Sequence, residues 1–172
     1  MSRRLGGIGA ASLLVGAVLG VAVTYSWMKA KPAAPQAEEP SMAHAIATHL
    51  MFDRDAEKAM NLYISLFKGS EISRIERYGP GEQGAAGTIK RADFILGGHR
   101  LICIDSPVKH AFTFTPSMSI FVDCENEAEL NEAFQQLSDG GQVLMPLDNY
   151  GFSKRFGWLK DRFGVSWQLN FQ

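Results

Sequence analysis

The segment Arg155-Phe-Gly-Trp-Leu-Lys-Asp-Arg-Phe-Gly-Val-Ser-Trp-Gln-Leu-Asn-Phe171 decides the fold, because two strand patterns lie close together in it. We expect strands at roughly 155–160 and 165–171. In the second strand, polar residues alternate with apolar ones; the polar residues are Ser166, Gln168 and Asn170. Successive side chains of a strand point to opposite faces, so this strand has one polar face that can line a cleft.

The residues before this segment complete a larger unit. Ser117 to Asp123 is predicted to be a strand, and Asn126 with Glu129 resembles a capping box at the start of a helix. Apolar residues at helical spacing give this helix one buried face, formed by Leu130, Ala133, Phe134 and Leu137. The turn Ser138-Asp-Gly-Gly then leads to another strand at roughly 142–146.

The same pattern occurs 70 residues earlier, where residues 46–52 form a predicted strand. Asp53 or Asp55 can cap the following helix. The buried face of that helix consists of Ala56, Ala59, Met60, Tyr63 and Phe67. Three strands are expected next, at roughly 71–78, 88–96 and 99–105, with Gly97-Gly98 as a two-residue hairpin turn.

Two modules are therefore predicted, residues 46–110 and 111–172, each with one strand, one helix and three strands. One helix covers only one face of a four-stranded sheet and leaves the other face open. Two such modules can pair to build a cleft between curved sheets, which predicts an α+β domain with its site on the open faces.

Several strings in these modules are similar to the vicinal oxygen chelate (VOC) superfamily, the glyoxalase and bleomycin-resistance fold, and above all to its PhnB-like branch. They are Thr48-His-Leu-Met-Phe-Asp53, Asp55-Ala-Glu-Lys-Ala-Met-Asn-Leu-Tyr63, Phe114-Thr-Pro-Ser-Met-Ser119 and Gly157-Trp-Leu-Lys-Asp-Arg-Phe-Gly-Val-Ser-Trp-Gln168. The resemblance covers about residues 46–172. It implies the VOC fold of two paired βαβββ modules and a homodimer.

Members of this branch carry the family description 3-demethylubiquinone-9 3-methyltransferase, but the residues do not favour methyl transfer. The sequence lacks a glycine-rich strand-to-helix turn of the nucleotide-binding kind. The loop Gly79 to Gly87 also lacks the Gly-Lys-Ser/Thr ending of a phosphate loop, so we interpret it as a hairpin connection.

Superfamily members that catalyse reactions resemble one another in a divalent metal held by His and Glu side chains from four strands. By this resemblance the ligand positions fall on Ala47 or His49, near Cys103, near Ser117 and on Gln168. Divalent sites normally need three or four good donors, and this set is depleted. We therefore expect no metal cofactor, with His49 and Gln168 as the candidate ligands of a divalent metal if one binds.

Other residues are candidates for the walls of the cleft. Asn170 shares the polar face of Gln168, and the ring of Trp158 can stack on a ligand. Asp105 follows Cys103 by two positions on one strand face and is the best candidate carboxylate. His49, Cys103 and Ser117 are further candidates for the open face of the cleft. Because Cys103 lies in Leu-Ile-Cys-Ile, a core position is the alternative for it, and it is not expected to be a nucleophile.

Two functions follow as hypotheses. The favoured one is a small-molecule binding protein without strong catalysis, in which an open and partly apolar cleft recognises its ligand. The alternative is a divalent-metal-dependent lyase, isomerase or dioxygenase that acts on a substrate with vicinal oxygens. The depleted ligand set favours the first hypothesis.

The composition of the chain limits the classes of partner that can be expected. The chain has 172 residues with 17 basic and 18 acidic side chains, a formal net charge of −1. Binding of nucleic acid is therefore not expected, because it normally requires a basic patch or stripe. The two cysteines, Cys103 and Cys124, cannot build a disulfide framework and lack the short spacing of a zinc finger.

The first 45 residues are predicted to tether the domain to a lipid bilayer. A short basic terminus, 1–4, precedes an uncharged transmembrane helix at 5–28 and a Pro/Ala-rich linker at 29–45. The 24 residues Leu5 to Met28 would span about 36 Å as a helix, enough to cross about 30 Å of hydrocarbon. A cleaved signal peptide is the alternative, although its apolar region is normally only about 7–15 residues long.

Orientation of the tether follows from its flanking charges. The α-amino group adds to Arg3 and Arg4, which favours a cytoplasmic N-terminus and a periplasmic domain on a bacterial inner membrane. A shorter soluble product that starts at Met42 is an alternative to the tethered form.

Overall fold

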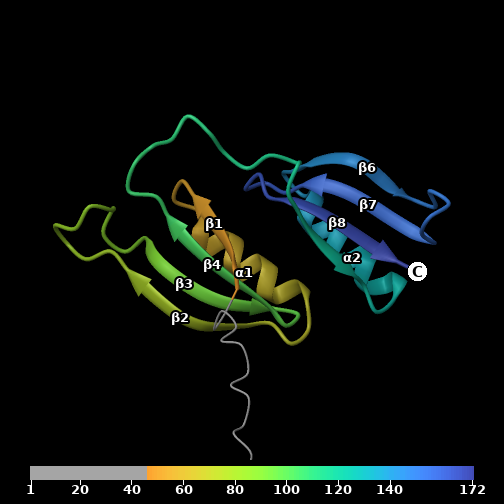
Figure 1. The fold of residues 1–172 in the computed structure, drawn as a ribbon, viewed down its shortest axis with the longest axis horizontal. Helices are drawn as coiled ribbons and strands as arrows, with labels where there is room; N and C mark the ends of the chain where they lie inside the picture. The colour runs from red at the N-terminus through yellow and green to blue at the C-terminus, as the bar shows by residue number, and fades with distance from the viewer. Residues whose placement is uncertain (1–45) are drawn as a thin grey trace, which may run out of the picture. The chain divides into compact units, whose positions relative to one another are not determined.

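The computed structural model describes residues 46–172, which form two successive βαβββ modules (Figure 1). The first module consists of β1 (Thr48–Phe52), α1 (Ala56–Leu66), β2 (Glu71–Arg77), β3 (Ile89–Leu96) and β4 (His99–Asp105). The second consists of β5 (Ser119–Asp123), α2 (Glu127–Ser138), β6 (Gln142–Asp148), β7 (Arg155–Lys160) and β8 (Ser166–Phe171). The predicted α+β repeat is confirmed.

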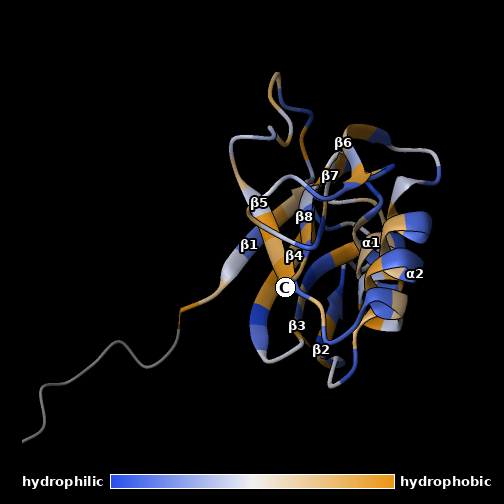
Figure 2. Cartoon of the chain, turned by 90° about the vertical axis from the view of Figure 1, so that its right-hand side faces the viewer, coloured by the Kyte–Doolittle hydropathy of each residue, from blue (hydrophilic) through white to orange (hydrophobic). Residues whose placement is uncertain are grey.

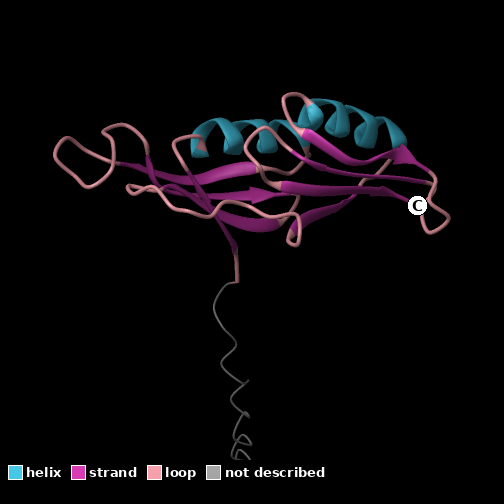
Figure 3. Cartoon of the chain, turned by 90° about the horizontal axis from the view of Figure 1, so that it is seen from above, coloured by secondary structure: helices cyan, strands magenta, loops and turns pink. Residues whose placement is uncertain are grey.

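Both modules have the same sheet topology. The strand orders are β1-β4-β3-β2 and β5-β8-β7-β6, so the first and last strands of each module are neighbours. These pairs, β1 with β4 and β5 with β8, are parallel, and the other pairs are antiparallel. Figure 3 shows both helices on the same side of the two sheets, which leaves the opposite sheet faces without a covering helix.

Local sequence explains the ends of α2. Asn126 is the N-cap residue, and its side-chain oxygen accepts a hydrogen bond from the Glu129 amide at 2.9 Å. The Glu129 carboxylate accepts in turn from the Glu125 amide at 2.7 Å. The predicted capping interaction is therefore confirmed, with the return bond one residue earlier than in a standard capping box.

The start of α1 is stabilised differently. Asp55 occupies the N-cap position but makes no side-chain capping bond. The Ala56 amide instead donates to the Asp105 carboxylate at 2.9 Å, from the end of β4. The expected cap by Asp53 or Asp55 is thus replaced by a carboxylate 49 residues further along the chain.

The hairpin between β3 and β4 is formed by Gly97 and Gly98, as the sequence predicts. Both have positive φ, 55° and 87°, a region that other L-residues rarely adopt. Two such residues give the turn type whose twist matches that of the flanking strands.

One apolar core joins the two modules between the helices and the sheets. Figure 2 shows both helices banded in blue and orange, as expected for helices with one polar and one apolar face. All five residues of the predicted first stripe are buried, and so are Leu130, Ala133 and Leu137 of the second. Trp167 of β8 lies against α1, with ring centroids 4.8 Å from Tyr63 and 6.0 Å from Phe67.

Asp161, in the turn between β7 and β8, fixes this junction. Its carboxylate accepts hydrogen bonds from Tyr63 Oη at 2.6 Å and from Trp167 Nε1 at 2.9 Å. The amides of Phe163 and Val165 also donate to it, at 2.9 and 3.0 Å. The four bonds satisfy a buried carboxylate and connect α1 to the second module.

The predicted N-terminal segments 1–4, 5–28 and 29–45 lie outside the described residues. Within residues 46–172, neither helix has the length and apolar character needed to cross a bilayer.

Candidate functional site

The candidate site is the face of each sheet that points away from its helix. In β8, the residues Trp167 and Leu169 point into the core, so Ser166, Gln168 and Asn170 share the opposite, open face. The alternation predicted from the sequence is therefore confirmed.

Strand pairing extends this face into three rows that cross the second sheet. The aspartate row contains Asp123, Asn170, Phe156 and Asp148, in the order β5, β8, β7, β6. The tryptophan row contains Phe121, Gln168, Trp158 and Met145. The serine row contains Ser119, Ser166, Lys160 and Gln142. The face therefore combines aromatic rings with amides, hydroxyls and carboxylates.

A hydrogen-bond network holds the polar groups of this face in place. Ser119 Oγ and Ser166 Oγ lie 2.7 Å apart, and Trp158 Nε1 donates to Ser166 Oγ at 2.9 Å. Gln168 Nε2 donates to Ser119 Oγ at 3.2 Å. These bonds fix the amide of Gln168, and among the described residues no donor contacts its oxygen. That oxygen is available to a ligand.

The aspartate row has a similar bond. Asn170 Nδ2 donates to Asp123 Oδ1 at 2.6 Å, so the exposed carboxylate of Asp123 is held by a buried amide. The structure thus brings three predicted site residues, Trp158, Gln168 and Asn170, onto one face.

His49 lies on the open face of the other sheet. It lines a cavity of about 500 Å³ between β1 and the segment that joins the modules. Met51, Val108, Phe112 and Phe114 supply apolar walls. His110 also lines this cavity, stacked on Phe112 at 4.8 Å between ring centroids and within 3.0 Å of Ser106 Oγ.

Cys103 and Asp105 are not on the open face, which corrects the expected position of both. Cys103 is fully buried in the core, where it pairs with Leu50 and Ala92, and burial raises the pKa of its thiol to about 12. Asp105 is 3% exposed, and its oxygens accept from the amides of Ala56 and Ile89 at 2.9 and 2.8 Å. Asp105 therefore stabilises the fold.

Ser117 lies in the loop before β5, exposed and hydrogen-bonded to the Thr115 hydroxyl. Its predicted strand position is thus two residues too early, because β5 begins at Ser119. Ser119 occupies the place on the open face that Ser117 was expected to hold.

The described side chains do not form a binding site for a metal ion. Within residues 46–172 no three His, Cys, Asp or Glu side chains are placed to hold an ion together. His49 and Gln168, the candidate ligands, lie on different sheets, and Cys103 faces the core. We therefore derive no chemical step through a metal.

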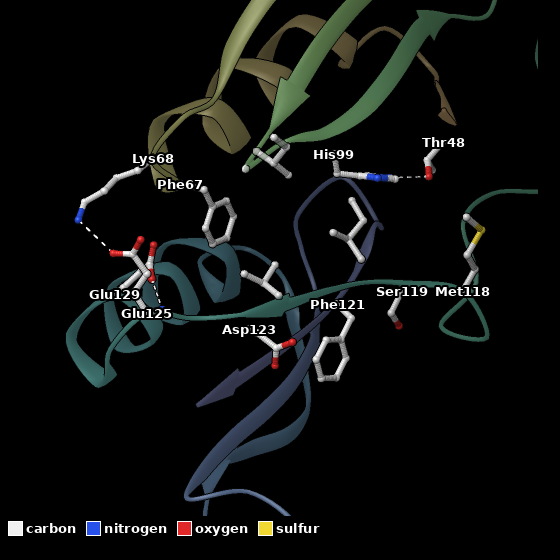
Figure 4. Close-up of a pocket in the computed structure, with 14 residues that line it drawn as sticks. Thr48, Phe67, Lys68, His99, Met118, Ser119, Phe121, Asp123, Glu125 and Glu129 are labelled. Atoms are coloured by element: carbon white, nitrogen blue, oxygen red, sulfur yellow. Dashed lines mark hydrogen bonds and ion pairs between the residues drawn. The ribbon is translucent and has the colours of Figure 1, made fainter. Parts of the chain in front are cut away.

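A cavity of about 630 Å³ runs along β5 and was not predicted (Figure 4). Figure 4 shows Ser119, Phe121 and Asp123 on the same side of β5. Across the cavity Thr48 Oγ1 lies 2.9 Å from His99 Nε2, and Lys68 pairs with Glu125 at 3.3 Å. The sequence of this strand carries little signal for such a site, because Ile120, Phe121 and Val122 are all apolar and only its two ends, Ser119 and Asp123, are polar.

Comparison with known proteins identifies the family. The sequence profile of a family described as 3-demethylubiquinone-9 3-methyltransferase matches residues 44–170. A solved structure of a putative 3-demethylubiquinone-9 3-methyltransferase, PhnB protein, from Bacillus cereus is 53% identical, with a TM-score of 0.72; the match covers 74% of this chain and 98% of that one. Protein PA1353 from Pseudomonas aeruginosa is 26% identical, with a TM-score of 0.66, over 76% of this chain and 98% of that one.

A comparison with curated proteins gave no match. The family profile nevertheless covers most of the chain, and the sheet topology is that of two βαβββ modules. The chain therefore belongs to the family described as 3-demethylubiquinone-9 3-methyltransferase, the PhnB-like branch of the VOC superfamily.

Proposed function

We propose that this domain binds a small organic molecule on the open face of its second sheet, without strong catalysis. The observation that carries the proposal is the fixed arrangement of Trp158 and Gln168 through Ser166 and Ser119. Small-molecule sites typically combine apolar and aromatic walls with a few polar groups at fixed positions. The tryptophan row supplies an indole ring, a phenyl ring and an oriented amide in adjacent positions.

A thermal-shift screen of the full-length protein against a small-molecule library tests the proposal. A ligand present at 100 times its Kd stabilises the folded state by about 2.7 kcal/mol. Gln168→Ala and Trp158→Phe should reduce the shift given by a hit. Gln136→Ala, on the exposed surface of α2, is the matched control and should leave it unchanged. A screen without hits, or hits insensitive to both site variants, would contradict the proposal.

Metal analysis separates this proposal from a metal-dependent enzyme. Protein purified without chelator is expected to hold no stoichiometric zinc, nickel, iron or manganese. One equivalent of such a metal, lost in the His49→Ala, Gln168→Ala double variant, would overturn the binding function in favour of a VOC lyase, isomerase or dioxygenase.

We also propose that residues 5–28 anchor the domain on the periplasmic side of a bacterial inner membrane and that two chains form a homodimer. The uncharged run at 5–28 supports the anchor. Full-length protein should stay in the membrane pellet after alkaline carbonate extraction, and its release into the supernatant would refute the anchor. Sedimentation equilibrium of detergent-solubilised protein measures the mass of the assembly and tests the dimer.

A further inference from the structure

The open face of the second sheet carries an aromatic cluster near the end of the aspartate row. Phe156 lies at its base, 5% exposed. The ring centroids of Phe152, Tyr150 and Phe121 lie 5.1, 6.1 and 6.5 Å from that of Phe156. Phe121 and Phe152 are 53% and 61% exposed, which is high for phenylalanine side chains of a folded domain.

The loop between β6 and β7 holds two of these rings in place. Tyr150 Oη donates to the Pro146 carbonyl at 2.9 Å. The Gly151 amide donates to Asn149 Oδ1 at 2.8 Å, and Gly151 has a φ of 85°, which suits glycine. The rings of Tyr150 and Phe152 stack with an interplanar angle of 18°. The aromatic surface is therefore preorganised rather than dependent on a ligand for its order.

Two exposed carboxylates flank this cluster. Asp123 on β5 and Asp148 on β6 are the two ends of the aspartate row, with Phe156 between them. Within residues 46–172, no lysine or arginine nitrogen lies within 4.0 Å of either carboxylate. The amide of Asn170 and the backbone amide of Asn149 contact them instead, and neither neutralises their charge.

Basic side chains close in sequence are directed elsewhere. Lys154, in the same loop, lies 5.7 Å from the ring centroid of Phe171. Arg155 pairs with Glu127 of α2 at 3.4 Å. Lys160 belongs to the serine row, two rows away from the aspartates. Among the described residues, the two carboxylates that flank the aromatic cluster therefore have no ion-pair partner.

We propose that this surface, defined by Phe121, Asp123, Asp148, Tyr150, Phe152 and Phe156, binds an organic cation whose positive charge lies on or beside a flat aromatic ring system. Aromatic faces attract cations through the ring quadrupole, and flat rings stack on them. The carboxylates add charge complementarity and disfavour anions. This inference rests on the proposed function and names the class of ligand.

Two probes of the same shape and opposite charge test the inference. 9-Aminoacridine is cationic at neutral pH, and acridine-9-carboxylate is an anion with the same ring system. Their fluorescence is titrated with the full-length protein at low and high salt. The cation should bind saturably and at least about fivefold more tightly than the anion, and its affinity should fall as salt screens the carboxylates.

Variants locate the binding. The double variant Asp123→Asn, Asp148→Asn keeps the shape of the surface and should weaken the cation by about fivefold or more while leaving the anion no weaker. Glu71→Gln, Glu132→Gln removes the same charge from exposed positions outside the surface and should leave binding unchanged. Phe121→Ala should weaken both probes, because each stacks on the ring.

Four results would overturn the inference. They are equal binding of both probes, no saturable binding of the cation, cation binding unaffected by loss of both carboxylates, and conversion of a dimer into monomers by Phe121→Ala without loss of cation binding. In the last case the surface is an interface between two copies. Neutral or anionic library hits that depend on Gln168 would preserve the proposed function while this inference fails, whereas a screen without hits removes both.

Discussion

At the scale of single residues, the buried Asp161 carboxylate accepts four hydrogen bonds and connects the two modules. Burial raises the pKa of its carboxyl, while the hydrogen bonds from Tyr63 and Trp167 oppose that rise. The four donors around the carboxylate favour its charged form and so offset part of the effect of burial. Asp161 lies within Gly157 to Gln168, the string that resembles the family. This string therefore contains residues needed for folding as well as residues of the open face.

We expect Asp161→Asn to destabilise the domain by about 1–3 kcal/mol, because an NH₂ group then faces an indole N–H that can only donate. The Tyr63 hydroxyl can reverse its role, whereas Trp167 cannot. Urea unfolding at neutral pH measures the loss. Asp139→Asn, an exposed carboxylate paired with Arg162, is the control and should change stability little. Equal effects of the two substitutions would show that the network does not stabilise the core.

Asp93 gives a prediction about pH. Its carboxylate lies between Arg91 and Arg100, with N–O distances of 2.7 and 2.8 Å. Hydrogen bonding from Arg91 lowers the pKa of Asp93 below its ordinary value. Because the pKa is lower in the folded state, the stabilisation is complete above the unfolded value of about 4 and is lost as pH falls through the folded pKa.

The free-energy difference between wild type and Asp93→Asn should therefore be largest near neutral pH and shrink below about pH 4. Urea titrations of both proteins across this range measure it. A difference that stays constant, or grows in acid, is incompatible with this account.

At the scale of elements, the two helices begin by different mechanisms and should respond differently to loss of their N-cap residues. Asn126→Ala removes a side-chain capping bond of α2 and should cost about 1 kcal/mol. Asp55→Ala is the matched control, because Asp55 makes no capping bond and Asp105 serves α1 instead. Thermal unfolding with calorimetry distinguishes them, and a larger loss from Asp55→Ala would contradict the assignment.

The sequence allowed most elements to be predicted, because their signals are local. Helical stripes, the Gly97-Gly98 turn and the Asn126 cap each depend on residues a few positions apart. The cap of α1 could not be predicted in this way, because its partner Asp105 becomes a neighbour only when β4 pairs with β1.

The candidate site was predictable only where a strand alternates. In β8 polar and apolar residues alternate, so the open face of Gln168 and Asn170 could be inferred. In β4 the sequence Leu-Ile-Cys-Ile is apolar on both faces, so periodicity could not show which side faces the helix. Cys103 and Asp105 were assigned to the wrong side for this reason.

At the scale of the whole domain, the two modules share one core rather than forming two independent ones. Tyr63 and Phe67 of the first module lie against Trp167 of the second, and Tyr63 donates to Asp161. Phe52 of β1 also contacts Phe114 and Phe163, with ring centroids 5.1 and 6.4 Å away. Separating the modules would expose these rings and remove the Tyr63 hydrogen bond from the Asp161 carboxylate.

We therefore predict that both modules unfold in one transition. In a Trp27→Phe background, the remaining tryptophans, Trp158 and Trp167, report the second module and its contact with α1, whereas far-ultraviolet circular dichroism reports all of both modules. The two signals should give the same urea midpoint, and Tyr63→Phe should lower both midpoints equally although it changes only the first module. Leu62→Ser, on the partly buried side of α1, is a control for destabilisation of the first module that does not involve the bond to Asp161. Midpoints that separate, or a fluorescence midpoint that Tyr63→Phe leaves unchanged, would mean that the shared core does not couple the modules and that each half of the repeat is stable by itself.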